Sequence, residues 1–448
     1  MSQKRVLSLP LIFHVKLIIP IRNFSLLSFL LLSIPPPSDM SYIINQINNK
    51  FNLNDEGLLK ARKIYENLSV SFKGPLTIED FKHLEMEHFE DINGKSQFFY
   101  LTSNNGDIVS TCEIVPRKGY HENSLNLLLS MVYTNPNYRK KGLVSKLLNW
   151  VIKFYENQTI DHDDTIIISE SITNKECMEY FNEAVPLKFR ESNNINWSLY
   201  SIVGTFYQQF GFNPCDEINW FQINSSDFPN EGEFQINETN EKLLTNEDID
   251  DYYFNEKYNF TPVNDTQLQN CSLEESSYAG FVARYQSYIE FNKDKFKDDD
   301  IKFAKNCGFY IKEIVNGKEY ETIAFICPFF FMNRIVINRI FTNVEDETIF
   351  TKHWERITKF VSNYAQNVWK TIPGLETYSD SDKLVMTADN DIVVKSENLN
   401  VKNITDIIKK STGWEDVGLG MVLPMIRDWK SLKSPPSKLA HNGHWSFM

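Results

Sequence analysis

Residues 132–148 read V-Y-T-N-P-N-Y-R-K-K-G-L-V-S-K-L-L, and this stretch decides the fold of the chain. A nearly continuous apolar run, 124–134, leads into it, and residues 142–156 carry apolar side chains at helical spacing. The pattern predicts a buried strand that turns directly into an amphipathic helix. Backbone N–H groups at the start of a helix lack intrahelical partners and can bind an anion.

The turn between this strand and helix concentrates positive charge. Gly142, which has no side chain, lets a phosphate approach the backbone closely. The positions that we expect to contact the anion are consecutive: Arg139, Lys140, Lys141, Gly142, Leu143, Val144 and Ser145. The alternative is a solvated basic turn in front of a surface helix.

The elements before the turn predict an α/β fold. Residues 54–69 and 77–89 have helical patterns, and 97–103 and 107–115 read as strands. Asn104-Asn105-Gly106 between these strands is typical of a tight hairpin turn. The strand over 124–134 completes a meander and is apolar enough to be buried on both faces.

The turn resembles motif A of the GNAT acetyltransferases, R/Q-x-x-G-x-G/A, which binds the diphosphate of acetyl-CoA. Val144 stands where the family has Gly or Ala. A second match follows a predicted strand at 195–201. The short helix predicted over 202–212 carries Phe206, Tyr207, Gly211 and Phe212, which match the family's F-Y-x-x-x-G-F segment.

The resemblance implies a GNAT fold, a mixed and mostly antiparallel sheet flanked by helices, with acetyl-CoA as co-substrate and no metal. In that fold the third meander strand splays from its neighbour, which would let the backbone N–H groups of Met131 and Val132 face the thioester carbonyl. Tyr207 would be the general acid for the departing thiolate. The alternative for Tyr207 is a buried ring with a solvated hydroxyl.

A general base is also needed, because an amine attacks only when it is neutral. Deprotonating a lysine ε-ammonium at neutral pH costs about 4.6 kcal/mol. Glu113, on the neighbouring strand, is the candidate, either as the base or as a partner of the substrate ammonium. The alternative is a strand carboxylate that points to solvent.

Three further segments resemble the fungal lysine acetyltransferases that act on the ε-amino group of free L-lysine during its degradation. They are S-T-C-E (110–113), L-Y-S-I-V-G-T-F-Y (199–207) and L-P-M-I-R (423–427). This resemblance implies L-lysine as the acceptor. The alternatives are a GNAT enzyme for another amine (a polyamine, an amino sugar or a protein N-terminus) and a non-catalytic CoA-binding scaffold.

Residues 157–192 form an insertion relative to that family. It contains T-I-I-I-S (165–169) and a helical E-C-M-E-Y-F (176–181). We expect this insertion to reshape the substrate entrance.

The second half predicts another α/β domain. Residues 224–251 are polar and acidic, which is typical of a linker. Strands are predicted at 308–314, 321–331 and 334–342, with a helix at 347–369. This order repeats the first domain without a phosphate-binding turn, so the domain is either a degenerate second GNAT-like unit or an unrelated α+β cap. The expected domains are 40–228 and 229–448.

The first 39 residues differ from the rest. They contain basic residues and no acidic one before Asp39. Their apolar runs are shorter than the roughly 20 residues that a spanning helix needs. We expect a removed presequence or an untranslated extension, with a membrane anchor as the less favoured alternative. Localisation is then cytoplasmic, or mitochondrial if the segment is a presequence.

Composition excludes several partners. The net charge of −13 argues against nucleic acid and suits a cationic small-molecule amine. The six cysteines form no C-x-x-C pair and are expected to be reduced thiols. His441-Asn442-Gly443-His444 lacks a third ligand type nearby, so no metal site is expected.

Overall fold

The fold was analysed in a computed structural model of the 448-residue chain. The structure describes residues 41–48, 55–74, 76–90, 96–118, 125–191, 195–214, 220–224, 234–252, 268–270, 282, 285–296, 298–329, 334–368, 385–389, 401–411, 413–418, 423–428 and 438–440. The first 39 residues and His441–His444 lie outside the described residues. No helix within these ranges is long and apolar enough to cross a lipid bilayer.

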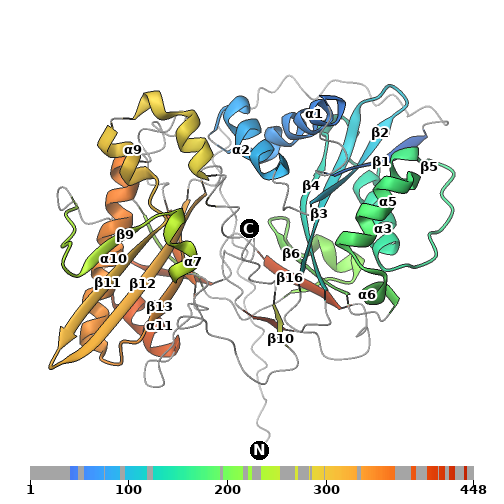
Figure 1. The fold of residues 1–448 in the computed structure, drawn as a ribbon. Helices are drawn as coiled ribbons and strands as arrows, with labels where there is room; N and C mark the ends of the chain where they lie inside the picture. Colours follow the sequence, from blue (N-terminus) through green and yellow to red (C-terminus); the bar gives the residue numbers. More distant parts are fainter. Residues whose placement is uncertain are drawn as a thin grey trace, which may run out of the picture. The chain divides into compact units, whose positions relative to one another are not determined.

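The first sheet has eight strands (Figure 1). In spatial order they are β5 (Ile166–Ile168), β1 (Tyr42–Asn48), β2 (Gln97–Ser103), β3 (Ile108–Lys118), β4 (Leu125–Thr134), β6 (Ile195–Ser201), β16 (Leu423–Asp428) and β7 (Asn213–Pro214). Pairing is antiparallel except between β1 and β5 and between β4 and β6. This mixed, mostly antiparallel sheet confirms the predicted fold class.

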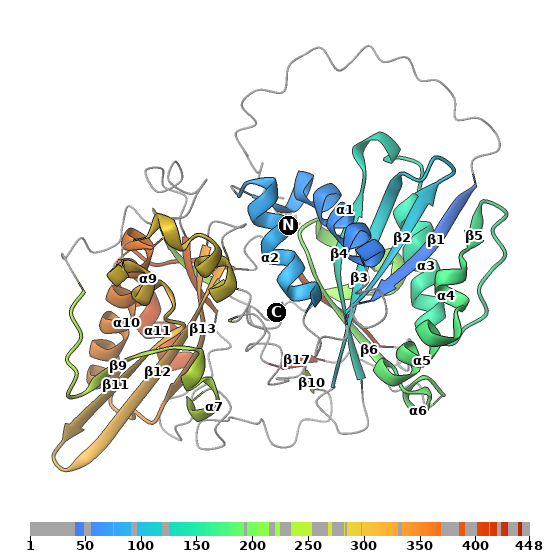
Figure 2. The same cartoon turned by 45° about the horizontal axis from the view of Figure 1, so that its top comes forward.

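Helices cover both faces of the first sheet (Figures 1 and 2). Successive residues of a strand point to opposite faces. On β2, Phe98 meets Tyr65 of α1 (Asp55–Phe72), with ring centroids 5.5 Å apart. Phe99 meets Tyr155 of α3 (Leu143–Tyr155), at 5.8 Å. Helix α1, with α2 (Ile78–Glu90), therefore lies on the face opposite α3.

The expected insertion forms an added edge of this sheet. It contains β5 and the helices α4 (Glu170–Thr173), α5 (Lys175–Ala184) and α6 (Leu187–Glu191). Strand β5 pairs with β1, at the edge away from β4 and β6, and Phe181 of α5 packs on Tyr155. Three strands separate β5 from β4, and the expected effect of this insertion on the substrate entrance stays a prediction.

The second sheet has seven strands. The strands are, in order, β15 (Glu415–Gly418), β8 (Trp220–Asn224), β14 (Val385–Asp389), β13 (Arg334–Thr342), β12 (Lys318–Phe329), β11 (Gly308–Val315) and β9 (Glu241–Leu244). The helices are α7 (Ile249–Tyr252), α9 (Asp298–Ala304), α10 (Glu347–Asn367) and α11 (Val401–Lys410). A separate pair joins β10 (Leu268–Asn270) to β17 (Lys438–Ala440).

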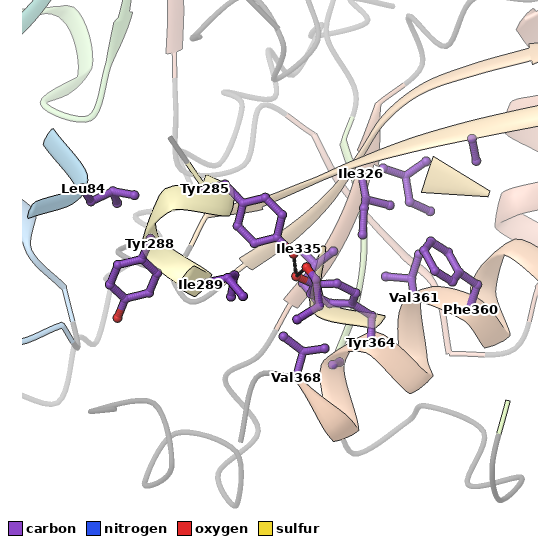
Figure 3. Packing of buried hydrophobic residues seen from close by; sticks show 14 of the residues in the cluster. Leu84, Tyr285, Tyr288, Ile289, Ile326, Ile335, Phe360, Val361, Tyr364 and Val368 are labelled. Atoms are coloured by element: carbon purple, nitrogen blue, oxygen red, sulfur yellow. Dashed lines mark hydrogen bonds between the residues drawn. The ribbon is translucent and has the colours of Figure 1, made fainter. Parts of the chain in front are cut away.

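The core of this second half is aromatic. On β11, Phe309 stacks on Phe360 of α10 at 5.3 Å, whereas Tyr310 meets Tyr252 of α7 on the other face. Figure 3 shows the hydroxyl groups of Tyr285 and Tyr364 hydrogen-bonded to each other among the buried side chains. Strand β9 lies within the segment expected to be a linker, which is therefore structured in part.

The second sheet repeats the topology of the first. From β9 through β11, β12 and β13 the strands are antiparallel, α10 follows, and β14 then pairs parallel with β13. The same order links β1, β2, β3 and β4 to α3 and β6. This repetition supports the degenerate second GNAT-like unit rather than an unrelated cap.

The two repeats exchange one strand each. Strand β8 follows β7 along the chain but lies between β14 and β15, in the second sheet. Strand β16 follows β15 but lies between β6 and β7, in the first. Each of the expected ranges, 40–228 and 229–448, therefore contributes one strand to the other's sheet.

Candidate active site

The predicted basic turn lies between β4 and α3. Pro136–Tyr138 form a 3-10 turn, and the Asn135 side chain accepts a hydrogen bond from the Asn137 N–H. Lys140 and Gly142 then adopt left-handed conformations, with φ of 64° and 71°. Gly142 is the residue that precedes α3, and a Cβ there would meet nothing within 4 Å. Open space thus surrounds the backbone where the sequence predicts a phosphate.

The start of α3 has the chemistry of an anion site. No side chain caps the first amides of α3. The corresponding helix of the second unit, α10, differs, because the Asp346 carboxylate accepts from the N–H groups of Thr348 and Ile349. A carboxylate at this place fills the donors and repels a phosphate. Of these two described helix starts, that of α3 leaves its first N–H groups open to an anion, as the predicted diphosphate site requires.

The side chains around this helix start divide into two groups. Arg139, Lys140 and Lys141 are exposed, and the Arg139 Nε donates to the Thr134 carbonyl at 3.1 Å. Leu143 is buried, so only its backbone can face an anion, while Val144 and Ser145 are half-buried. The predicted positions therefore comprise a basic rim and a row of backbone donors.

Strand β4 separates from β6 in the middle of the sheet. The parallel pairing joins Leu125–Leu128 to Ile195–Ser198 and extends no further among the described residues. Side chains of β4 change from buried to half-buried at Ser130. The register with β3 also shifts here, which leaves Met131 and Val132 opposite Cys112, and Met131 has a φ of 47°. The expected splay from β6 therefore occurs at the residues assigned to the thioester carbonyl, together with a bulge opposite β3.

Tyr207 lies just beyond the end of β6. It belongs to the 3-10 helix η3 (Gly204–Phe210), which ends at Gly211 with a φ of 83°. The side chain is 8% exposed. Burial raises the pKa of Tyr207 above its ordinary value of 10, and the Cys112 thiol adds to the rise. Tyr207 thus keeps its proton at neutral pH and can act as a donor.

Glu113 is buried, with 2% of its surface exposed. Its Oε1 accepts a hydrogen bond from Ser96, and its Oε2 accepts one of 2.5 Å from Ser130. The alternative that this carboxylate points to solvent is therefore wrong. On β3 it pairs with Phe98 and so faces the side of α1, whereas Cys112 pairs with Phe99 and faces α3.

The predicted site residues lie on or next to β4, or directly after its neighbour β6. The basic turn, Met131 and Val132 lie on or after β4, and Glu113 reaches this strand through Ser130. Tyr207 follows the strand from which β4 separates. Sequence reasoning missed Ser96 and Ser130. Ser130 interrupts the apolar residues 127–132 of β4, and that contrast could have identified it.

Metal ligands are not assembled within the described part of the chain. No three His, Cys, Asp or Glu side chains in these ranges gather in a group that could hold an ion. Cys112, Cys177, Cys307 and Cys327 are buried.

Residues 61–170 match the model of the acetyltransferase (GNAT) family. The matched segment runs from α1 through the basic turn to the first residue of α4. No curated protein sequence matches the chain.

Several solved structures are similar in part. A probable N-acyltransferase of unknown function from Enterococcus faecalis V583 is 11% identical, with 87% of this chain and 73% of that chain covered and a TM-score of 0.41. A GCN5-related N-acetyltransferase from Kribbella flavida is 11% identical, with coverage of 86% and 70% and a TM-score of 0.38. A GNAT family N-acetyltransferase from Escherichia coli in complex with CoA is 13% identical, with coverage of 40% and 71% and a TM-score of 0.25.

Proposed function

We propose that the chain, whose residues 61–170 match the acetyltransferase (GNAT) family model, is an acetyl-CoA-dependent N-acetyltransferase whose acceptor is the ε-amino group of free L-lysine. The observation that carries the activity is the uncapped, basic start of α3 beside the separation of β4 from β6. The acceptor rests on the likeness of S-T-C-E, L-Y-S-I-V-G-T-F-Y and L-P-M-I-R to the lysine acetyltransferases. The acidic net charge of −13 suits this cationic acceptor. The process that we propose on the same likeness is lysine degradation, in the cytoplasm or, with a cleaved presequence, in mitochondria.

The turn before α3 would bind the co-substrate. When bound, acetyl-CoA supplies an acetyl group as a thioester that an amine can attack. The amides of Leu143, Val144 and Ser145, with the N-terminal end of the helix dipole, would hold the diphosphate. Arg139, Lys140 and Lys141 add charge at the exposed rim.

Two groups of the chain serve the thioester end. Backbone N–H groups at Met131 and Val132 would donate to the carbonyl oxygen as negative charge builds there. They lie in the bulge where β4 has left β6. The Tyr207 hydroxyl, which is protonated at neutral pH, would give its proton to the sulfur as the carbon–sulfur bond breaks.

The amine proton would leave through Ser130 to Glu113. Ser130 is half-buried, and its hydroxyl already donates to the Glu113 carboxylate. As this hydroxyl proton moves to Glu113, the Ser130 oxygen takes one from the amine, so Glu113 gains one proton net. Glu113 thus acts as the base through a hydroxyl rather than by direct contact.

The acceptor is tested by measuring thiol release from acetyl-CoA with a panel of amines. The panel contains L-lysine, Nα-acetyl-lysine, Nε-acetyl-lysine, spermidine, glucosamine and a peptide with a free N-terminus. We expect release with lysine and none with Nε-acetyl-lysine, and mass spectrometry should find Nε-acetyl-lysine as the product.

The other outcomes identify the alternatives. Release with spermidine, glucosamine or the peptide but not with lysine would refute the acceptor while leaving the activity in place. No thiol release with any amine would favour a CoA-binding scaffold.

A further inference from the structure

A strand from the C-terminal end of the chain completes the first sheet beside Tyr207. Met425 of β16 pairs with Leu199 of β6 on one side and with Pro214 of β7 on the other. The segment between β6 and β7 is η3, which carries Tyr207. Strand β16 therefore joins the two strands that flank the proposed acid.

Arg427 is the polar anchor of this strand. Its Nε and Nη2 donate to the two oxygens of Glu156, at 3.0 and 2.8 Å, and its Nη1 donates to the Phe210 carbonyl at 2.9 Å. Arg427 is 9% exposed and Glu156 is 2% exposed. One guanidinium therefore joins Glu156, the residue directly after α3, to Phe210, the last residue of η3.

The partners of Arg427 are themselves fixed. Glu156 also accepts hydrogen bonds from the Trp197 indole at 3.0 Å and from Gln158 at 2.8 Å. Gly211, directly after η3, packs so closely on Arg427 that a Cβ at this position would overlap the guanidinium. The end of η3 is thus held by a buried, hydrogen-bonded group.

We propose that Arg427 is a positioning residue, which sets the place of the Tyr207 hydroxyl by holding the end of η3 against α3. Phe210, whose carbonyl it binds, lies one turn of a 3-10 helix after Tyr207. A shift of the acid by about 1 Å is enough to slow a reaction strongly. The C-terminal half of the chain thereby takes part in catalysis without touching the substrate.

The test is a double-mutant cycle on the full chain with the best acceptor of the amine panel, since the inference rests on the proposed acetyl transfer. Arg427→Gln should lower kcat about tenfold or more with the KM for acetyl-CoA nearly unchanged. In a Tyr207→Phe background the same change should lower kcat by less than about twofold, because the acid is already absent. An equal loss in both backgrounds, or a rise in KM alone, would overturn the proposal.

A matched control is available in the second unit. Arg356 also forms a bidentate pair, with its Nε 2.8 Å from Glu241 Oε1 and its Nη2 bonded to Oε2. Arg356→Gln removes the same type of interaction and should leave kcat within about twofold. A loss of kcat as large as that of Arg427→Gln would overturn the positioning role.

Arg427→Lys distinguishes a loss of positioning from a failure to fold. A lysine keeps the buried charge but cannot bind Glu156 and Phe210 together, so kcat should still fall while the melting temperature stays near that of Arg356→Gln. Full kcat in Arg427→Lys would contradict the proposal. An inactive wild-type chain would instead refute the acetyl transfer itself.

Discussion

At the residue scale, Tyr207 should carry the proton to the leaving thiolate. Burial and the nearby Cys112 thiol raise the pKa of Tyr207, so it stays protonated across the neutral range. Tyr207→Phe keeps the ring that packs on Phe206 and Phe212 but removes the hydroxyl. We expect kcat to fall by about tenfold or more while acetyl-CoA affinity is kept. Steady-state kinetics measures kcat and calorimetry measures the affinity for acetyl-CoA. An unchanged kcat would show that Tyr207 is not the general acid.

Glu113 allows a paired test, because two serines bind its two oxygens. Ser130 is half-buried on β4, whereas Ser96 is buried. Ser130→Ala should lower kcat by about tenfold, since it interrupts the proposed route of the amine proton. Ser96→Ala should have the smaller effect on kcat. We would measure kcat as a function of pH for both variants. An equal loss of kcat in the two variants would contradict a proton route through Ser130.

At the element scale, the two related helices differ in how they begin. Helix α3 begins after Gly142 without a side-chain cap, and α10 is capped by Asp346. Gly142→Asp would give α3 a carboxylate like that of α10. We expect the Kd for acetyl-CoA to rise about tenfold or more, because an acidic group replaces the anion at the N–H donors.

Gly106 provides the control for this substitution. It has a φ of 79°, close to the 71° of Gly142, and a Cβ on it also meets nothing within 4 Å. Gly106→Asp therefore imposes similar backbone strain in the turn between β2 and β3. Calorimetric titration should show an unchanged Kd for this control, and equal weakening in both variants would attribute the effect to strain.

The second unit should make stability depend on pH through His353 of α10. Burial lowers the pKa of His353 below its ordinary 6.5, despite Glu313 at 3.6 Å, and its Nδ1 shares a 2.7 Å hydrogen bond with the Thr322 hydroxyl. A histidine with a lowered folded pKa stabilises the protein above its unfolded pKa, and that stability is lost as the pH falls. The urea midpoint should therefore drop between about pH 7.5 and 5.5.

His353→Asn tests this assignment, because asparagine can still bond to Thr322 but does not titrate. Its urea midpoint should depend less on pH over the same range. The same slope in both proteins would place the titration elsewhere.

At the scale of the whole molecule, the chain contains two related sheets that exchange a strand. Local patterns predicted the parts built from neighbouring residues. The strands 97–103 and 195–201 have the predicted bounds, and the helix at 142–156 is observed as Leu143–Tyr155. These elements have clear periodicity and strong turn residues such as Gly106.

The parts that could not be predicted depend on contacts between distant residues. L-P-M-I-R was noted as a likeness, but its place beside β6 depends on Arg427 meeting Glu156, 271 residues away along the chain. Strand β1 has a mixed composition, and the position of β5 beside it depends on pairing alone. The role proposed for Ser130 depends on its hydrogen bond to the buried Glu113 on the neighbouring strand. Residues joined by such pairings lack a local pattern that reveals them.

The sheet topology is repeated, but the helix starts differ, so we expect only the first unit to bind acetyl-CoA. The measurement that tests it most directly is calorimetric titration of the full chain with CoA, which gives the number of binding sites. We expect one molecule of CoA to bind per chain. Two sites per chain, or no binding at all, would contradict it.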